Sequence, residues 1–244
     1  MMQRRRAIFS NTAYAFTATV SSLLKKLKRT LLKWRQPQMN LLDGRFDAFK
    51  ALYPSASQAT FPEDYKNFAI EEFRRFHSIG GTILESILPL EQKVGERLYS
   101  HILLRSIFEN YFWLIYIFDG QNEIVCRDRF NEYMNGFKNE YYKLHNEAAL
   151  PHKDQLVLPD AAWRTLRAPD VRSLLTRLTT IRGEKLDYLY FVYRITSFDT
   201  HGKTMKVLFN NAFKQDCNFP VMKVKEAINL IADSYVALWG SLGG

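Results

Sequence analysis

The chain has 244 residues, of which 47% are hydrophobic, 14% aromatic and 24% charged. These proportions are typical of a folded globular protein and exclude disorder over most of the length. Eleven glycines and eight prolines are few for a loop-rich β-sandwich. The two cysteines, Cys126 and Cys217, exclude a disulfide scaffold and a cysteine zinc site, and they favour a reducing compartment such as the cytosol.

The formal net charge of +9 is concentrated in one segment. Nine of the 34 lysines and arginines lie in residues 1–36, ahead of the first acidic residue, Asp43. The rest of the chain therefore carries equal numbers of basic and acidic residues, which argues against a uniformly basic nucleic-acid-binding body. We predict a basic tail over residues 1–36, a linker over residues 37–62 and a helical domain over residues 63–244.

The tail has the pattern of a basic amphipathic helix. Apolar side chains recur at helical spacing up to Trp34, and six cations mostly face away from them: Lys25, Lys26, Lys28, Arg29, Lys33 and Arg35. Such helices lie in the interface of anionic membranes, which predicts a cytoplasmic protein held peripherally on the inner face of the membrane. The alternatives are a targeting peptide, a segment that binds nucleic-acid phosphates, and a helix that docks on the body or on a partner subunit.

The remainder predicts an all-α fold, a bundle of about five to six helices, because clean period-2 alternation is nearly absent. The expected helices end at glycines and prolines, with a turn at Pro54, a stop at Pro89 and a break at Pro169. Gly80 and Gly81 are expected to loosen the helix that contains them. In chain order the helices are expected over residues 45–52, 62–88, 91–118, 122–149, 160–181, 184–201 and 221–239.

Common catalytic and cofactor motifs are missing. There is no phosphate-binding G-x-x-x-x-G-K-[ST] loop, no H-E-x-x-H zinc motif and no G-x-S-x-G nucleophile elbow. The five histidines include no pair spaced i, i+4. We therefore predict neither a metal site nor a cofactor.

Two polar groups lie on apolar helices. The first is Arg105 with Glu109, which share a face at i, i+4 spacing among apolar neighbours. This pair is interpreted either as a structural ion pair or as a functional carboxylate and guanidinium, since buried charges need partners and perturbed charges gather at functional sites.

The second group runs along the helix expected over residues 184–201. At about 100° per residue, Tyr190, Arg194, Ser197 and His201 fall on one face, with His201 at the helix end. The group is either a satisfied polar seam between helices or a site.

Arg194 and His201 form an R-x6-H pattern, which resembles the signature of HEPN domains, helical bundles that often act as metal-independent ribonucleases. The chain also resembles an uncharacterised group of bacterial helical proteins with an R-x-x-x-E helix and a Y-x-x-x-S-x-x-x-H helix. Here the second pattern corresponds to Tyr193, Ser197 and His201, and the first to Arg105 and Glu109. The resemblance covers roughly residues 60–240.

The resemblance implies transesterification of RNA, in a toxin or antiphage effector. His201 would take the proton of a ribose 2′-hydroxyl as general base, and Arg194 would stabilise charge on the phosphate. Ser197 or Tyr190 would position a phosphate oxygen, and Glu109 would orient the histidine or pair with an arginine. Two protomers typically pair in HEPN domains, which implies a homodimer or a larger complex.

Two other functions compete with RNA cleavage. One is a non-catalytic helical module that its basic tail tethers to a membrane surface. The other is a sensing bundle in which Arg105, Glu109, Arg194 and His201 line a pocket for an anionic ligand such as a nucleotide. The nearby aromatics Tyr111, Trp113 and Tyr190 belong either to such a pocket or to the core.

Overall fold

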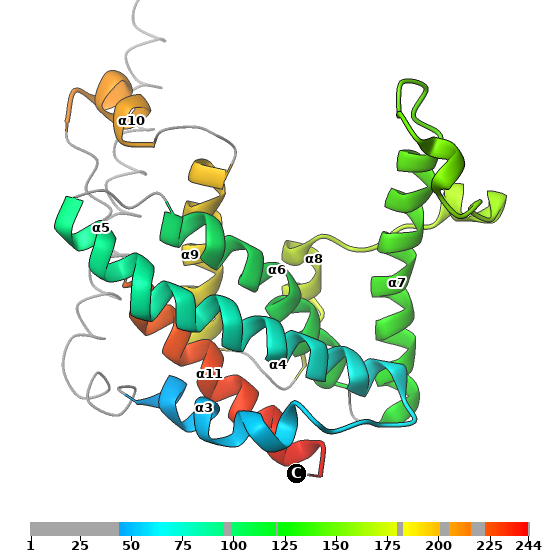
Figure 1. The fold of residues 1–244 in the computed structure, drawn as a ribbon, viewed down its shortest axis with the longest axis horizontal. Coiled ribbons are helices and arrows are strands. Elements are labelled where there is room, and N and C mark those ends of the chain that lie inside the picture. The colour runs from blue at the N-terminus through cyan, green and yellow to red at the C-terminus, as the bar shows by residue number, and fades with distance from the viewer. Residues whose placement is uncertain are drawn as a thin grey trace, which may run out of the picture. The chain divides into compact units, whose positions relative to one another are not determined.

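The computed structural model describes residues 44–94, 99–120, 122–179, 183–200, 205–215 and 223–243. Every regular element in these ranges is helical, which confirms the all-α class (Figure 1). The elements are α3 (Arg45–Ala56), α4 (Asp64–Thr82), the π-helical turn η1 (Ile83–Ile87), α5 (Leu88–Val94), α6 (Tyr99–Phe118), α7 (Glu123–His145), the 3-10 turns η2 (Lys153–Gln155) and η3 (Ala161–Thr165), α8 (Val171–Thr176), α9 (Glu184–Thr200), α10 (Met205–Phe213) and α11 (Val224–Ser241).

The helices above all belong to one unit, Gly44–Gly244. The predicted tail and its six cations, Lys25, Lys26, Lys28, Arg29, Lys33 and Arg35, lie outside the described residues. In the described part of the chain, no helix combines the length and the apolar character needed to cross a membrane.

Helix α6 is the centre of the bundle. It packs against α4, α7, α8, α9 and α11. Leu104, Phe108, Phe112 and Leu114 are all fully buried, so α6 buries side chains around much of its circumference. A helix of this kind is stable only when neighbours cover it, and the uninterrupted apolar run over residues 111–118 predicts this central position.

Helix α3 corrects the predicted linker. It packs on α11 and α4, and Phe49 is fully buried there. The Phe49 ring lies 5.0 Å from that of Phe76 and 6.1 Å from that of Tyr235, in a cluster of aromatic rings. Burying one such ring stabilises the fold by about 1.5–3 kcal/mol. The chain from Gly44 onward is therefore part of the bundle, and α3 extends through the turn expected at Pro54.

The predicted helix stop at Pro89 is wrong. The helical path continues through η1 into α5, where Pro89 is the second residue. In η1 the Leu88 amide donates to the carbonyl of Ile83, a π-type bond that widens the turn just before the proline. A wider turn leaves room for the proline ring, which would otherwise clash with the carbonyl one turn back.

Gly80 lies at a tight contact between two helices. A Cβ atom added there would lie 2.9 Å from Cε2 of the buried Phe46 ring. The glycine therefore allows α3 and α4 to approach each other closely.

Several other boundaries differ from the prediction. Helix α7 starts as expected, because Asn122 accepts a hydrogen bond from the Val125 amide as its N-cap, but it ends at His145, four residues early. The helix expected over residues 160–181 does break around Pro169, and it consists of two short pieces, η3 and α8, each begun by an aspartate cap, Asp160 and Asp170. Helix α10 occupies a stretch for which no element was predicted.

Candidate functional site

Helices α6 and α9, which carry the two predicted polar groups, pack against each other. Ring contacts run in opposite directions along the two helices: Phe112 lies 6.3 Å from Tyr190, and Phe108 lies 6.2 Å from Tyr193. The first half of α6 therefore lies beside the second half of α9. This antiparallel packing places Arg105 next to Tyr193.

Arg105 lies between Glu109 and Tyr193. Its Nη2 is 3.0 Å from Oε1 of Glu109, and its Cζ is 3.6 Å from the centre of the Tyr193 ring. The Arg105 side chain is only 14% exposed, whereas that of Glu109 is 56% exposed. Within the described residues, the buried Nη1 of Arg105 has no hydrogen-bond partner. The guanidinium is thus a partly buried cation with one donor group unused.

The phenol of Tyr193 is held neutral. Burial raises the pKa of Tyr193, and the positive charge of Arg105 only partly opposes that rise. The ring therefore presents a neutral π-face to the guanidinium. A cation stacked in this way contributes about 0.5–2 kcal/mol, depending on its exposure.

Tyr190, Ser197 and Arg194 flank Tyr193 on α9. Tyr190 is half-buried, and its ring stacks on that of Tyr193 at 6.0 Å. The Ser197 hydroxyl donates to the Tyr193 carbonyl at 3.0 Å, which leaves its oxygen free to accept a second bond. Arg194 is exposed and forms no ion pair with any described residue. His201 lies outside the described residues.

The predicted residues thus divide into two groups. Arg105 and Tyr193 meet at the contact between α6 and α9, which we call the α6–α9 seam, and Ser197 bonds to the Tyr193 carbonyl within α9. Arg194 is exposed on α9, and Tyr190 is half-buried. Tyr111 is fully buried in the core, and burial raises its pKa far above the usual range.

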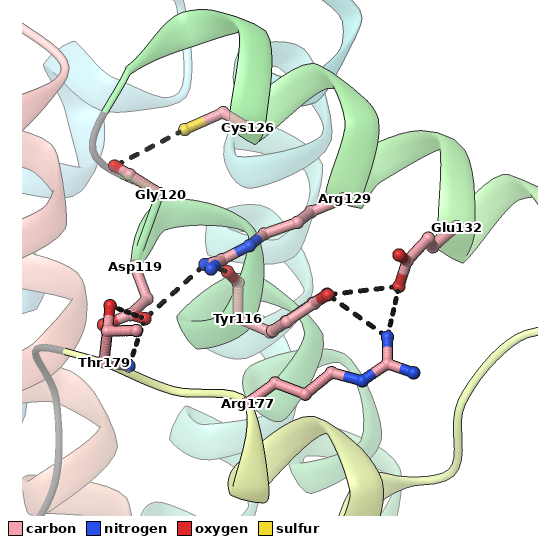
Figure 2. A network of polar contacts seen from close by, with 8 residues as sticks. All are labelled: Tyr116, Asp119, Gly120, Cys126, Arg129, Glu132, Arg177 and Thr179. Carbon is pink, nitrogen blue, oxygen red and sulfur yellow. Dashed lines mark hydrogen bonds and ion pairs between the residues drawn. The ribbon is translucent and has the colours of Figure 1, made fainter.

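A polar network that sequence reasoning missed lies at the other end of α6 (Figure 2). The carboxylate of Asp119 is completely buried. Its Oδ2 accepts hydrogen bonds from the amide and the hydroxyl of Thr179, at 2.7 and 3.0 Å, and lies 3.5 Å from Nη1 of Arg129. Asp119 therefore ties the segment after α8 to the corner between α6 and α7.

The same network continues through Tyr116. Its hydroxyl donates to Oε2 of Glu132 at 3.1 Å, and Arg177 donates to the same oxygen at 3.0 Å. Arg129 lies over the Tyr116 ring, with its Cζ 4.5 Å from the ring centre. These partners all satisfy one another, so we interpret the network as structural. In the sequence, this network is marked by one feature, Asp119 directly after an apolar run, and that feature is equally typical of a helix end.

A third polar cluster joins α4 to α6. Oε1 of the buried Glu72 accepts a hydrogen bond from Nδ2 of Asn110 at 2.7 Å, and its Oε2 lies 3.5 Å from Nη1 of Arg75. Burial raises the pKa of Glu72, and Arg75 opposes the rise. The sequence gives no sign of this cluster, because its members come from two helices far apart in the chain.

Of the three groups, the α6–α9 seam is the one with an unused cationic donor. A buried guanidinium with a free N–H suits an anionic oxygen, such as one of a phosphate. Within the described residues, no group of three or more histidine, cysteine, aspartate or glutamate side chains is arranged to hold a metal ion. Comparison with protein families, with curated proteins and with solved structures found no match to this chain.

Proposed function

We propose that the chain is a metal-independent endoribonuclease whose phosphate-binding side is the α6–α9 seam. The observation that carries this proposal is the Nη1 of Arg105, a buried donor that no described residue satisfies. Buried polar groups without partners are rare in folded proteins, and those at functional sites await a ligand. A phosphate oxygen is an acceptor of the right charge for this donor.

In the proposed reaction the 2′-oxygen of a ribose attacks the adjacent phosphorus, and the bond to the 5′-oxygen breaks. His201 takes the 2′-hydroxyl proton, and the leaving 5′-oxygen gains a proton, so that a 2′,3′-cyclic phosphate and a 5′-hydroxyl form. Arg105 and Arg194 stabilise the negative charge that develops on the phosphate oxygens. The support for these roles is the seam geometry for Arg105 and the R-x6-H resemblance for Arg194 and His201.

The test is incubation of the full chain with total RNA and with transfer RNA in the presence of a chelator. We expect the wild type to cleave, and His201→Ala and Arg194→Ala to lose cleavage. Arg127→Ala is the matched control, because Arg127 is an exposed arginine on α7 away from the seam. Intact RNA with folded wild type, or equal loss in the control, would contradict the proposal.

The same resemblance motivates two companion proposals, a toxin or antiphage role and a homodimer that brings two seams into one cleft. Growth arrest caused by wild type and not by His201→Ala supports the first. A sedimentation mass of one protomer at assay concentration would exclude the second.

A second candidate function is a non-catalytic module attached to an anionic membrane by residues 1–36. It is favoured by the nine cations of that segment, which has no acidic residue. Binding to anionic vesicles should be lost when residues 1–36 are deleted, and it should weaken as salt rises. Binding that survives the deletion unchanged would refute a tail-based tether.

A further inference from the structure

The second half of α7 carries an exposed apolar surface that neither proposed function uses. Phe137, Tyr141 and Leu144 share one face of the helix at i, i+4, i+7 spacing. The Tyr141 hydroxyl donates to the Val157 carbonyl at 2.7 Å, which places Val157 and Leu158 beside this face. We call these five residues the α7 patch. Their exposed fractions include 57% for Phe137, 43% for Leu144, 79% for Val157 and 80% for Leu158.

The α7 patch is held in a defined shape. The side-chain amide of Asn139, which is buried, donates to the carbonyls of Trp163 and Arg164, each at 3.0 Å. The Trp163 ring lies 6.3 Å from that of Tyr141. At Gly136, an added Cβ would lie 2.8 Å from Cβ of Ala168, so the returning chain packs directly on the helix. The apolar side chains are therefore displayed by a fixed scaffold.

A second copy of the chain is a poor occupant for the patch. The side chains of the α7 patch expose on the order of 400 Å² of surface, whereas each partner of a stable dimer buries about 800 Å². RNA fits poorly as well, because the two most exposed members, Val157 and Leu158, are aliphatic and offer no ring on which a base can stack.

A lipid bilayer fits better, because it accepts convex apolar side chains without needing a complementary pocket. Tyrosine, tryptophan and lysine are the residues that line membrane interfaces, and Tyr141, Trp163 and Lys138 lie together here, with Nζ of Lys138 5.8 Å from the Trp163 ring centre. The charges over residues 137–158 balance, three lysines against three acids: Lys138, Lys143, Lys153, Glu140, Glu147 and Asp154.

We propose that the α7 patch inserts into the interface of a lipid bilayer, with Val157 and Leu158 as its deepest residues. Because the local charges balance, this contact depends on apolar burial and resists salt, unlike any contact made by the basic tail. The inference does not depend on RNA cleavage or on the tail.

The test is co-sedimentation of the full chain with vesicles of phosphatidylcholine alone and of phosphatidylcholine with phosphatidylglycerol. It is run at low salt and at about 1 M salt, where the screening length is about 3 Å. The variant is Val157→Ser with Leu158→Ser. The matched control is Ile124→Ser, since Ile124 is 70% exposed at the opposite end of α7. Unchanged melting temperatures check that both variants are folded.

We expect wild type and control to bind both vesicle types at high salt, and the double variant to bind at least about tenfold more weakly, as loss of two buried aliphatic side chains requires. RNA cleavage should be the same in all three proteins, so failure here and failure of the proposed nuclease are distinguishable. Absence of wild-type binding at high salt, or equal binding by the double variant, would overturn the proposal. A wild-type dimer that the double variant converts to monomer would also overturn it, by assigning the patch to a second copy.

Discussion

Replacing Arg105 by methionine separates a structural role of this residue from a role in binding phosphate. Methionine keeps the apolar stem and removes the guanidinium. The loss of the stacking on Tyr193 costs about 0.5–2 kcal/mol, and the loss of the ion pair with the half-exposed Glu109 costs at most about 1 kcal/mol. Removing the buried, unpartnered Nη1 relieves a desolvation cost of about 1–3 kcal/mol.

These contributions have opposite signs, so the free energy of unfolding should change by less than about 1 kcal/mol. Urea unfolding followed by circular dichroism measures this change. If Arg105 stabilises charge on a phosphate, RNA cleavage should fall by about 10²–10³-fold in the same variant. A loss of stability of about 3 kcal/mol or more, as expected on breaking a buried ion pair, with cleavage retained, would show that Arg105 only joins the helices and does not bind phosphate.

Three further predictions concern the bundle. Gly80→Ala should lower the free energy of unfolding by about 1–3 kcal/mol, because the new Cβ meets the buried Phe46 ring at 2.9 Å. Gly81→Ala, whose Cβ would lie 3.9 Å from that ring, should raise the free energy of unfolding by about 0.5–1 kcal/mol, and equal effects of the two variants in urea unfolding would contradict the packing. Asp119→Ala should lower the free energy of unfolding by about 3–5 kcal/mol, because it leaves a partly buried arginine and two donors without their acceptor. A melting temperature within a degree of wild type would be inconsistent with the network in Figure 2. The pKa of Glu72 is raised from its usual value near 4.5, so the folded state keeps a proton that the unfolded state has lost, and stability should fall as pH rises from about 4.5 to the raised pKa. Glu72→Gln should abolish that fall in urea midpoints measured against pH, and a variant profile identical to that of wild type would argue against a role for Glu72.

Much of the fold could be predicted because its helices have local signals. The apolar run over residues 111–118 identified the central helix, and Asn122 marked the start of α7. The failures have tertiary causes. Pro89 looked like a stop because the sequence does not show the π-helical turn that accommodates it. The helix expected over residues 45–52 was placed in a linker, because the burial of Phe46 and Phe49 depends on rings contributed by α4 and α11.

The candidate site likewise combines a feature that is local in the sequence with contacts between helices that the sequence does not show. The i, i+4 spacing predicted that Arg105 and Glu109 share a helix face, and their side chains do form an ion pair within α6. The stacking of Arg105 on Tyr193 was out of reach, because it depends on how α6 and α9 cross. Asp119 and Glu72 were missed for a similar reason, since their partners Thr179 and Asn110 are 60 and 38 residues away in the chain.

The ends of the RNA fragments show directly whether this bundle cleaves RNA by transesterification. A defined oligonucleotide is incubated with wild type and with His201→Ala, chelator present, and the products are analysed by mass spectrometry. We expect fragments ending in a 2′,3′-cyclic phosphate with wild type and intact oligonucleotide with the variant. Intact RNA with both proteins, or fragments with other ends, would rule out this reaction.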